Sequence, residues 1–542
     1  MKYFIKFNKV LLPMVLILTF GSCTKNYEEI NTNPNDPTDV PGKNIFTNVV
    51  INSVGTELGG WIQHTYLGNW SQQWCKVQYI DEDRYQTRDM TGYFEGPYRG
   101  TLMDLQIIID KAQQDIDDGH EVTNNQTLLA AAKIMRVWIF DYLTDIFGDL
   151  PYSEALQGLK KDGITTPKYD TQESIYTSFF NELEEANTLL DLSTATSFGS
   201  ADLLFNGDPA QWKKFGNSLR LRLLDRVAGT PWSFTYNMVG GGQVTTDAGP
   251  AAYANADADI AMILGNSSKY PIMESNADNA KLVYPGIPYR NPIFNALYSR
   301  TDQAISETMV NWLLARNDPR LPVYAQTTVA SDTSSWPQYY GFQNGSDKAS
   351  AFFPQISLLG TAIAYDENAP LYILTYDEIE FIIAEYQMRN NQDAAARTAY
   401  EAGITASMDR WGADVGTYLS DPAVDWSTAA TPGEKYQRIC EQRWAAIFGQ
   451  GVQAYNLVRR TGFPERIFEY ELAGTNYPGL GLPVRITYSL NEEVYNTMNL
   501  QEAKTRQNVE TSNEGMFSTS GTSSQLWWHT RKNPIPTVTD PQ

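Results

Sequence analysis

The sequence predicts a mainly α-helical protein, and three observations carry this prediction. The first is a long apolar stretch, residues 124–147, whose large side chains recur at three- and four-residue steps. The second is a series of helix-start signals, in which Asp, Thr or Pro precedes an apolar stripe. The third is a pair of helical patterns, at 375–389 and 393–411, joined by a short turn. We therefore expect a scaffold of packed helices.

The chain begins with a secretory pattern. Lysines near the first residue precede an apolar run at 10–20, which is too short to span a bilayer as a helix. Two small residues then lead into Cys23, as in a bacterial lipoprotein signal. We expect residues 1–22 to be a signal peptide and Cys23 to be lipidated. The alternative is an ordinary secretory signal in which Cys23 has no special role.

The stretch after the signal differs in composition from the rest of the chain. Residues 23–43 are rich in Asn, Pro and Asp and poor in apolar side chains, so we expect an extended tether. Residues 44–542 are long enough for a sizeable core, and we expect them to form the folded domain. No later segment is apolar enough to cross a membrane, so the lipid on Cys23 is the expected membrane anchor.

Charge and missing motifs exclude several classes of function. The formal net charge is −22 and no basic stripe is present, so we expect no nucleic-acid partner. The sequence has no GxxxxGK, HExxH, CxxC or GxSxG motif, and its 3 histidines are scattered. We therefore expect no cofactor, no catalytic residues and no enzymatic activity. Asn255, Asp257 and Asp259 alternate like part of a calcium loop, but the glycine and final Glu of an EF-hand are missing, so we expect no metal.

Two cysteines remain if Cys23 is lipidated. Cys75 and Cys440 lie far apart in sequence, and their spacing does not fix their distance in space. We expect two buried free thiols. A disulfide formed in an oxidising compartment is the alternative.

The central helix is expected at residues 124–147. Thr123 and Gln126 have the spacing of a capping box, and Gly148 followed by Pro151 should end the helix. Its apolar surface is wider than a surface helix needs, so we expect packing on more than one side.

Other helices are expected before and after the central one. A helix at 100–118 precedes it. Later starts are expected at Asp170 with Glu173, Asp208 with Pro209, Thr375 with Glu378, Asp393, and Thr431 with Glu434. Arg220, Arg222 and Arg226 on one of these helices are more typical of a salt-bridged face than of a binding site.

Aromatic side chains are concentrated in segments that have few helix signals. They gather between residues 61 and 98, and again in the loop-rich stretch 327–370. Amide and charged side chains lie between them. Aromatic faces beside hydrogen-bonding groups suit sugar rings, and they also suit extended peptides. For any single aromatic residue the alternative is burial in the core.

Several segments resemble one known family. The run RVWIFDYLTDIFGDLPYSEAL at 136–156 resembles the most recognisable segment of the SusD/RagB family of outer-membrane nutrient-binding lipoproteins. Further segments similar to that family are NTNPNDPT, DPRLP, YYGFQNG, PLYILTYDEIEFIIAEY, LPVRITYSLNEEVYN and LWWHT. The resemblance covers nearly all of the chain after Cys23. It implies a tetratricopeptide-like helical scaffold with a loop-rich ligand-binding lobe.

The resemblance also implies a function. It predicts a surface-exposed lipoprotein of the outer membrane that binds oligosaccharides and delivers them, as a lid, to a TonB-dependent, SusC-like transporter. The same role with oligopeptides as ligand is the alternative, and a surface glycoside hydrolase is the less favoured one. The expected mechanism is binding and hinged delivery without covalent chemistry.

The family places its ligand contacts in an early segment after the first helix and in loops past mid-chain. In this chain those positions correspond to residues 70–98 and 284–345, and we expect the two stretches to meet. The expected ligand-binding residues are Trp70, Trp74, Tyr79, Tyr289, Arg290, Trp336, Tyr339 and Tyr340. The aromatic rings would stack on sugar faces or peptide side chains, and Arg290 would donate hydrogen bonds or meet a carboxylate.

Overall fold

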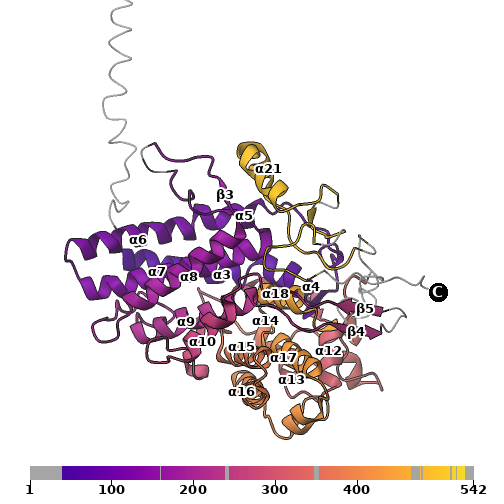
Figure 1. Cartoon of the computed structure of the whole chain (residues 1–542). Helices are drawn as coiled ribbons and strands as arrows, with labels where there is room; N and C mark the ends of the chain where they lie inside the picture. The colour runs from indigo at the N-terminus through magenta and orange to yellow at the C-terminus, as the bar shows by residue number, and fades with distance from the viewer. Residues whose placement is uncertain are drawn as a thin grey trace, which may run out of the picture.

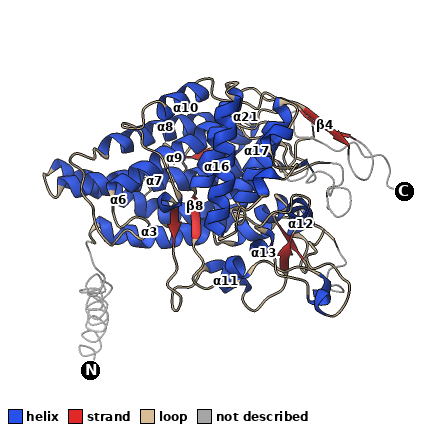
Figure 2. Cartoon of the chain, turned by 90° about the horizontal axis from the view of Figure 1, so that it is seen from below, coloured by secondary structure: helices blue, strands red, loops and turns tan. Residues whose placement is uncertain are grey.

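The computed structural model describes residues 40–158, 160, 162–237, 243–346, 353–465, 477, 480–512, 515–519 and 522–531. The expected signal peptide, Cys23 and nearly all of the expected tether lie outside these residues. The described chain is mainly helical, as predicted (Figures 1 and 2). No helix in it is long and apolar enough to span a bilayer.

Helices provide most of the structure. They are α3 (Gly42–Glu57), a π-helical turn (Ile62–Leu67), α4 (Gly68–Trp70), α5 (Thr91–Arg99), α6 (Thr101–Asp117), α7 (Val122–Phe147), α8 (Gln172–Leu189), α9 (Pro209–Val227), α10 (Ala256–Leu264), α11 (Pro292–Leu297), α12 (Glu307–Leu314), α13 (Leu321–Tyr324), α14 (Thr361–Ala364), α15 (Tyr376–Arg389), α16 (Asp393–Trp411), α17 (Pro432–Ala446), α18 (Gly451–Thr461), α20 (Leu490–Tyr495) and α21 (Thr497–Arg506).

Short strands pair in antiparallel, two-stranded sheets. The pairs are β1 (Trp74–Lys76) with β7 (Gln303–Ile305), β2 (Leu150–Pro151) with β3 (Tyr169–Asp170), β4 (Phe234–Asn237) with β5 (Gln243–Thr246), and β6 (Ala280–Leu282) with β8 (Leu371–Leu374). Each pair joins segments between helices, so the sheets fasten loops to the helical scaffold.

The helix α7 lies at the centre of one half of the scaffold. It packs against α3, α6, α8, α9 and α18, and its side chains are buried on all sides over its second half. It ends as predicted at Gly148, whose φ of 87° favours glycine. The predicted capping box is wrong, because Glu121 is the N-cap residue and Thr123 lies inside the helix. The long apolar pattern thus predicts the helix and its end, but not its start.

The other half of the scaffold contains the expected helix pair. The helices α15 and α16 pack along each other, and α17 packs against α15 (Figure 1). Gly412 ends α16 in the left-handed conformation. Thr431 and Glu434 form the predicted capping box of α17, and Asp208 caps α9 as predicted.

Three other predicted helix starts need correction. Thr375 is the N-cap residue of α15, but Glu378 does not complete a capping box because its carboxylate binds Arg222 of α9. At α8 the capping side chain is that of Thr171, while Asp170 accepts hydrogen bonds from Ser153. Asp393 is the first residue of α16, not its cap. In the first two cases the carboxylate accepts hydrogen bonds from a residue that is distant in sequence.

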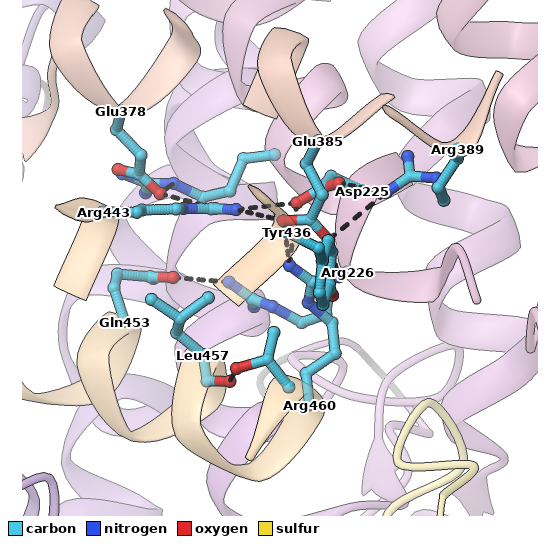
Figure 3. A network of polar contacts seen from close by, with 12 residues as sticks. Asp225, Arg226, Glu378, Glu385, Arg389, Tyr436, Arg443, Gln453, Leu457 and Arg460 are labelled. Carbon is cyan, nitrogen blue, oxygen red and sulfur yellow. Dashed lines mark hydrogen bonds and ion pairs between the residues drawn. The ribbon is translucent and has the colours of Figure 1, made fainter. Parts of the chain in front are cut away.

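A buried ion network joins the two halves of the scaffold (Figure 3). We call it the four-helix network, because α9, α15, α17 and α18 all contribute to it. Asp225 of α9 accepts hydrogen bonds from Arg389 at 3.0 Å, Arg443 at 2.7 Å and Arg460 at 3.2 Å. Glu385 of α15 binds Arg460 and also lies 3.3 Å from Arg389. The guanidinium groups lower the pKa of Asp225 to about 2, although burial opposes this shift.

The predicted arginine cluster on α9 belongs to this region. Arg222 binds Glu378, and Arg226 binds Asp141 of α7 at 2.9 Å, while Arg220 pairs with Glu184 of α8. The ion pairing is confirmed, but all three arginine residues are buried in the scaffold. The cluster therefore holds helices together.

The cysteine prediction is confirmed. Cys75 and Cys440 are both buried and free. Burial raises the pKa of each thiol well above its ordinary value, so both stay protonated and unreactive.

A buried carboxyl group at the end of α3 makes the stability of the fold depend on pH. Burial raises the pKa of Glu57 from 4.5 to about 8. The folded state therefore keeps a proton that the unfolded chain releases near pH 4.5. It follows that the free energy of unfolding contributed by this group is highest at low pH and is lost as pH rises to about 8.

We expect Glu57→Gln to remove this loss. Relative to the wild type, the variant should gain less than about 1 kcal/mol of unfolding free energy at pH 5 and about 4 kcal/mol at pH 8, at about 1.4 kcal/mol for each pH unit above 4.5. Urea titrations of both proteins at four pH values between 5 and 8 measure the difference. Parallel pH profiles for the two proteins would show that Glu57 is ionised in the folded state.

Candidate ligand-binding surface

The structure brings together the two stretches that the sequence analysis expected to meet. The strand β1 pairs with β7, so that Trp74 lies opposite Ile305 and Lys76 opposite Gln303. Further along, Val77 N–H donates to the Asp302 carbonyl at 3.0 Å. Residues from the early aromatic segment and from the region past mid-chain are thus neighbours at this junction.

Asn344 and Asp83 fasten a third segment to the same junction. The Asn344 amide donates to Asp83 Oδ1 at 2.7 Å and to the Trp74 carbonyl at 2.9 Å, and Gly345 N–H donates to Asp83 Oδ2 at 2.7 Å. Burial raises the pKa of Asp83 to about 7, although these hydrogen bonds oppose the shift. The turn at Asn344 and Gly345 thereby holds the loop that carries Trp336 and Tyr340 against β1.

An exposed row of aromatic and cationic side chains runs along α11. The guanidinium group of Arg290 lies 5.5 Å from the Phe294 ring centroid, and Phe294 stacks on Tyr298 at 5.2 Å between centroids. Arg290 also pairs with Glu367 at 2.7 Å. Tyr289 is 63% and Tyr298 56% exposed. A single exposed ring is normal, but aromatic rings that are exposed next to one another are typical of a binding surface.

A second group of side chains continues this row from α11 to β1. Arg300 and Lys76 both bind Asp302, at 2.8 and 3.3 Å, and the Lys76 ammonium lies 5.3 Å from the Trp61 ring centroid. Tyr79, just beyond β1, is 67% exposed and contributes to the electrostatic environment of Arg300. We call the set Trp61, Tyr79, Tyr289, Arg290, Phe294, Tyr298 and Arg300 the aromatic row.

The expected residues of the later loop lie on the other side of β7. Trp336 and Tyr340 contact each other with ring centroids 5.3 Å apart, and the Trp336 indole donates to the Gln355 carbonyl at 2.9 Å. Tyr340 is hydrogen-bonded to Ser357, whose carbonyl accepts from Ile305 of β7. Tyr339 is half-buried against the core. Trp336 and Tyr340 therefore flank the junction, while Tyr339 mainly supports it.

Two of the expected stacking residues are corrected by the structure. Trp70 and Trp74 are each 1% exposed and belong to the hydrophobic core. The Trp70 indole donates to the Glu82 carbonyl at 2.8 Å, and the Trp74 ring packs against His64 and Phe448. Their faces are covered by other side chains, so neither ring is available to a ligand. The other expected residues stay candidates, with Tyr79, Tyr289 and Tyr340 the most exposed.

The sequence analysis did not single out Trp61, Phe294, Tyr298 or Arg300. The sequence does contain a pattern from which two of these residues could have been predicted. Phe294 and Tyr298 are four positions apart, so they share one face of a short helix. Arg290 and Arg300 flank that pair in sequence. An aromatic pair of this kind between two arginine residues indicates a surface in which rings and hydrogen-bond donors alternate.

The charged groups of the aromatic row are arranged for binding. Although burial opposes it, the hydrogen bonds and charges of Arg300 and Lys76 hold the pKa of Asp302 below its usual range. A carboxyl group that stays ionised is a poor proton donor, so Asp302 is unsuited to act as a general acid.

The calcium-like run of the sequence has another partner. Asp257 of this run binds Arg389 at 3.0 Å. Among the described residues, no group of three or more His, Cys, Asp or Glu side chains is placed to hold a metal ion.

Comparison with known proteins gives a match over most of the chain. A family model described as "Starch-binding associating with outer membrane" matches residues 34–238 and 245–489. These ranges include the scaffold helices α3 to α18 and the whole aromatic row. A search of the curated proteins finds no match.

Solved structures share the same fold. A SusD homologue from Bacteroides fragilis is 23% identical, with 91% of this chain and 100% of that chain covered and a TM-score of 0.71. A chitin-binding SusD homologue from Flavobacterium johnsoniae is 24% identical, with 92% and 98% covered and a TM-score of 0.71. A SusD homologue from Bacteroides uniformis is 24% identical, with 91% and 100% covered and a TM-score of 0.69.

Proposed function

We propose, starting from the fact that this chain belongs to the SusD-like family, that it binds oligosaccharides at the surface of a bacterial outer membrane. The aromatic row is the proposed binding surface. The observation that carries this assignment is the exposure of Tyr79, Tyr289 and Tyr298 beside guanidinium and carboxylate groups. Sugar rings present apolar faces edged by hydroxyl groups, and alternating rings and polar groups match both features.

The pairing of the arginine residues favours a neutral glycan over a peptide. Arg290 is paired with Glu367, and Arg300 shares the carboxylate of Asp302 with Lys76, so each guanidinium already has a carboxylate partner within the protein. Paired ions still have donor and acceptor atoms directed outward, and hydroxyl groups can bind to both kinds. The chitin-binding relative and the family description support the same ligand class.

The proposal extends to the protein's place in the cell. The lipoprotein pattern around Cys23 supports a lipid anchor, and the Pro-rich residues 23–43 support a tether that holds the folded domain away from the membrane. The proposed partner is a TonB-dependent transporter of the SusC kind, which would receive the glycan from this protein acting as a lid. The proposed role is binding and delivery.

The test is titration calorimetry of the purified protein with malto- and chito-oligosaccharides and with mixed oligopeptides. We expect a glycan to bind, and Tyr289→Ala combined with Tyr298→Ala to weaken that binding by at least about tenfold, since well-placed aromatic contacts each contribute about 1 kcal/mol or more. Both rings are exposed, so the midpoint of thermal unfolding should barely change.

A matched control is Tyr495→Ala on α20. Tyr495 is also exposed, at 74%, and α21, which follows α20 directly, lies far from α11 in Figure 2, so glycan affinity should be unchanged. Binding of peptides alone would assign the surface to the alternative ligand. Glycan binding that the double variant leaves intact would place the site elsewhere, and release of new reducing ends would indicate a hydrolase.

A further inference from the structure

A pocket of about 200 Å³ lies between α11, α14, β8, α16 and the loop that joins α17 to α18. We call it the α11–α16 pocket. Its wall includes Asn291, Ile293, Asp366, Tyr372, Trp411 and Gln450. Pockets for drug-sized ligands measure about 300–1,000 Å³, so this pocket has room for a single small ring and not for several linked rings.

The wall of the pocket contains polar atoms that the protein itself leaves without partners. Gln450 is 4% exposed, and its Oε1 accepts no hydrogen bond from any described residue. The Arg410 Nε–H and the Trp411 indole N–H, also in the wall, find no acceptor in the described part of the chain. Buried polar atoms of native proteins are nearly always paired, so these exceptions around one pocket indicate a bound molecule that supplies the missing partners.

The missing partners are both donors and acceptors. Gln450 Oε1 needs a donor, whereas the N–H groups of Arg410 and Trp411 need acceptors. A hydroxyl group can donate and accept, and a sugar ring carries several hydroxyl groups. The rings of Tyr372 and Trp411 are half-buried in the wall, and they supply the apolar surface that suits the face of a sugar ring.

The charges of the pocket disfavour ionic ligands. Arg410 is already paired with Asp377 at 2.7 Å. Its guanidinium group lies 4.9 Å from the Tyr372 ring centroid and 4.8 Å from that of Trp411. Both rings therefore have a cation beside them, which would repel the ammonium group of a peptide. Asp366 is an exposed carboxylate of the wall, and it would repel an anion. A neutral ring fits best.

The pocket adjoins the aromatic row. Asn291 lines the pocket and directly follows Arg290, which belongs to the row. The Asn291 N–H donates to the Glu367 carbonyl at 2.9 Å, and the Glu367 carboxylate pairs with Arg290 at 2.7 Å. Glu367 in turn directly follows Asp366 of the pocket wall. The ion pair between Arg290 and Glu367 therefore connects the row to the pocket.

We propose that the α11–α16 pocket binds one neutral sugar unit at the end of an oligosaccharide whose other units lie on the aromatic row. This inference rests on the proposed function, because it takes the oligosaccharide and the row from that proposal. It adds that the protein selects chain ends, because a pocket with room for one ring receives the end of a chain and not its middle. The class of ligand is thus an oligosaccharide with a free end.

The test is titration calorimetry of the purified protein with maltohexaose and chitohexaose. Ala362 is exposed and lines the pocket, so Ala362→Trp should block it. We expect this variant to bind at least tenfold more weakly the hexaose that the wild type binds. The control is Ala395→Trp on α16, where the alanine is also exposed but does not line the pocket, and its affinity should equal that of the wild type.

Gln450→Leu provides a second measurement, which separates a binding role from a structural one. Leu is similar in size to Gln and has no polar atom that needs a partner. The midpoint of thermal unfolding should therefore stay the same or rise, while hexaose affinity should fall at least tenfold. A lower midpoint with unchanged affinity would make Gln450 a structural residue and overturn the inference.

The remaining outcomes distinguish the inference from the proposed function. Full hexaose affinity in Ala362→Trp would overturn the pocket assignment and leave the proposed function intact, whereas absence of glycan binding to the wild type would overturn both. Cyclomaltohexaose has no chain end, so Ala362→Trp should not change its affinity, and an equal loss would show that the variant blocks the row. A crystal structure with the bound hexaose should show a terminal sugar beside Gln450. Water alone in the pocket would overturn the inference.

Discussion

Asp225→Asn is expected to lower the free energy of unfolding by about 3–5 kcal/mol, because it removes a buried carboxylate and leaves cations without their partner. Arg389, Arg443 and Arg460 all donate to Asp225, and they come from three different helices. The substitution keeps the side-chain volume, so the loss measures charge pairing and not a cavity. Urea unfolding followed by circular dichroism at pH 7 measures it.

The matched control is Glu401→Gln. Glu401 pairs with Arg397 on the surface of α16, where both side chains are at least one-third exposed, and an exposed pair contributes about 0–1 kcal/mol. The difference between wild type and Asp225→Asn should also shrink as pH falls from about 4 to about 2, since protonation then removes the same charge from the wild type. A loss at pH 7 no larger than that of Glu401→Gln would show that the four-helix network does not hold the two halves together.

Trp74→Ala is expected to cost about 3–5 kcal/mol of stability, the usual result of emptying a buried tryptophan site. Trp74 is 1% exposed, and its ring is enclosed by side chains of the π-helical turn and of the segment after α17. Thermal and urea unfolding measure this loss. If Trp74→Ala also binds glycan more weakly, we expect the cause to be disorder of the β1–β7 junction and not the loss of a direct contact.

The control lies five positions along the same stretch. Tyr79→Ala removes a ring that is 67% exposed, so stability should change by no more than about 0.5 kcal/mol while glycan affinity falls. The two variants should therefore give opposite patterns. A stable Trp74→Ala protein with reduced affinity would return Trp74 to the ligand surface.

Sequence patterns correctly predicted the helices and caps that depend on interactions between residues close together in the chain. The helix α7 follows from a long apolar repeat, and its end follows from Gly148, whose positive φ requires a residue without Cβ. The caps at Asp208 and Thr431 were predicted for the same reason, since each side chain binds backbone N–H groups two or three positions ahead. The capping box of Thr375 with Glu378 and the cap at Asp170 did not form, because the Glu378 carboxylate binds Arg222 and the Asp170 carboxylate accepts from Ser153, and neither partner is a local neighbour.

The candidate site shows the same limit. The sequence indicated which two stretches meet, through resemblance to a family, and the pairing of β1 with β7 confirms their contact. The sequence could not tell that Trp74 is buried and Tyr79 exposed, because both are aromatic residues in the same short segment.

By itself, the sequence determined the helical class, the long central helix and the family to which the chain belongs. Only the tertiary structure decided which aromatic rings are exposed to water and which carboxylates pair with the arginine residues of α9. It also decided that α20 and α21 expose apolar side chains. The physical reason is that burial and ion pairing depend on partners brought from distant parts of the chain. Helix periodicity and backbone capping depend only on residues within a few positions.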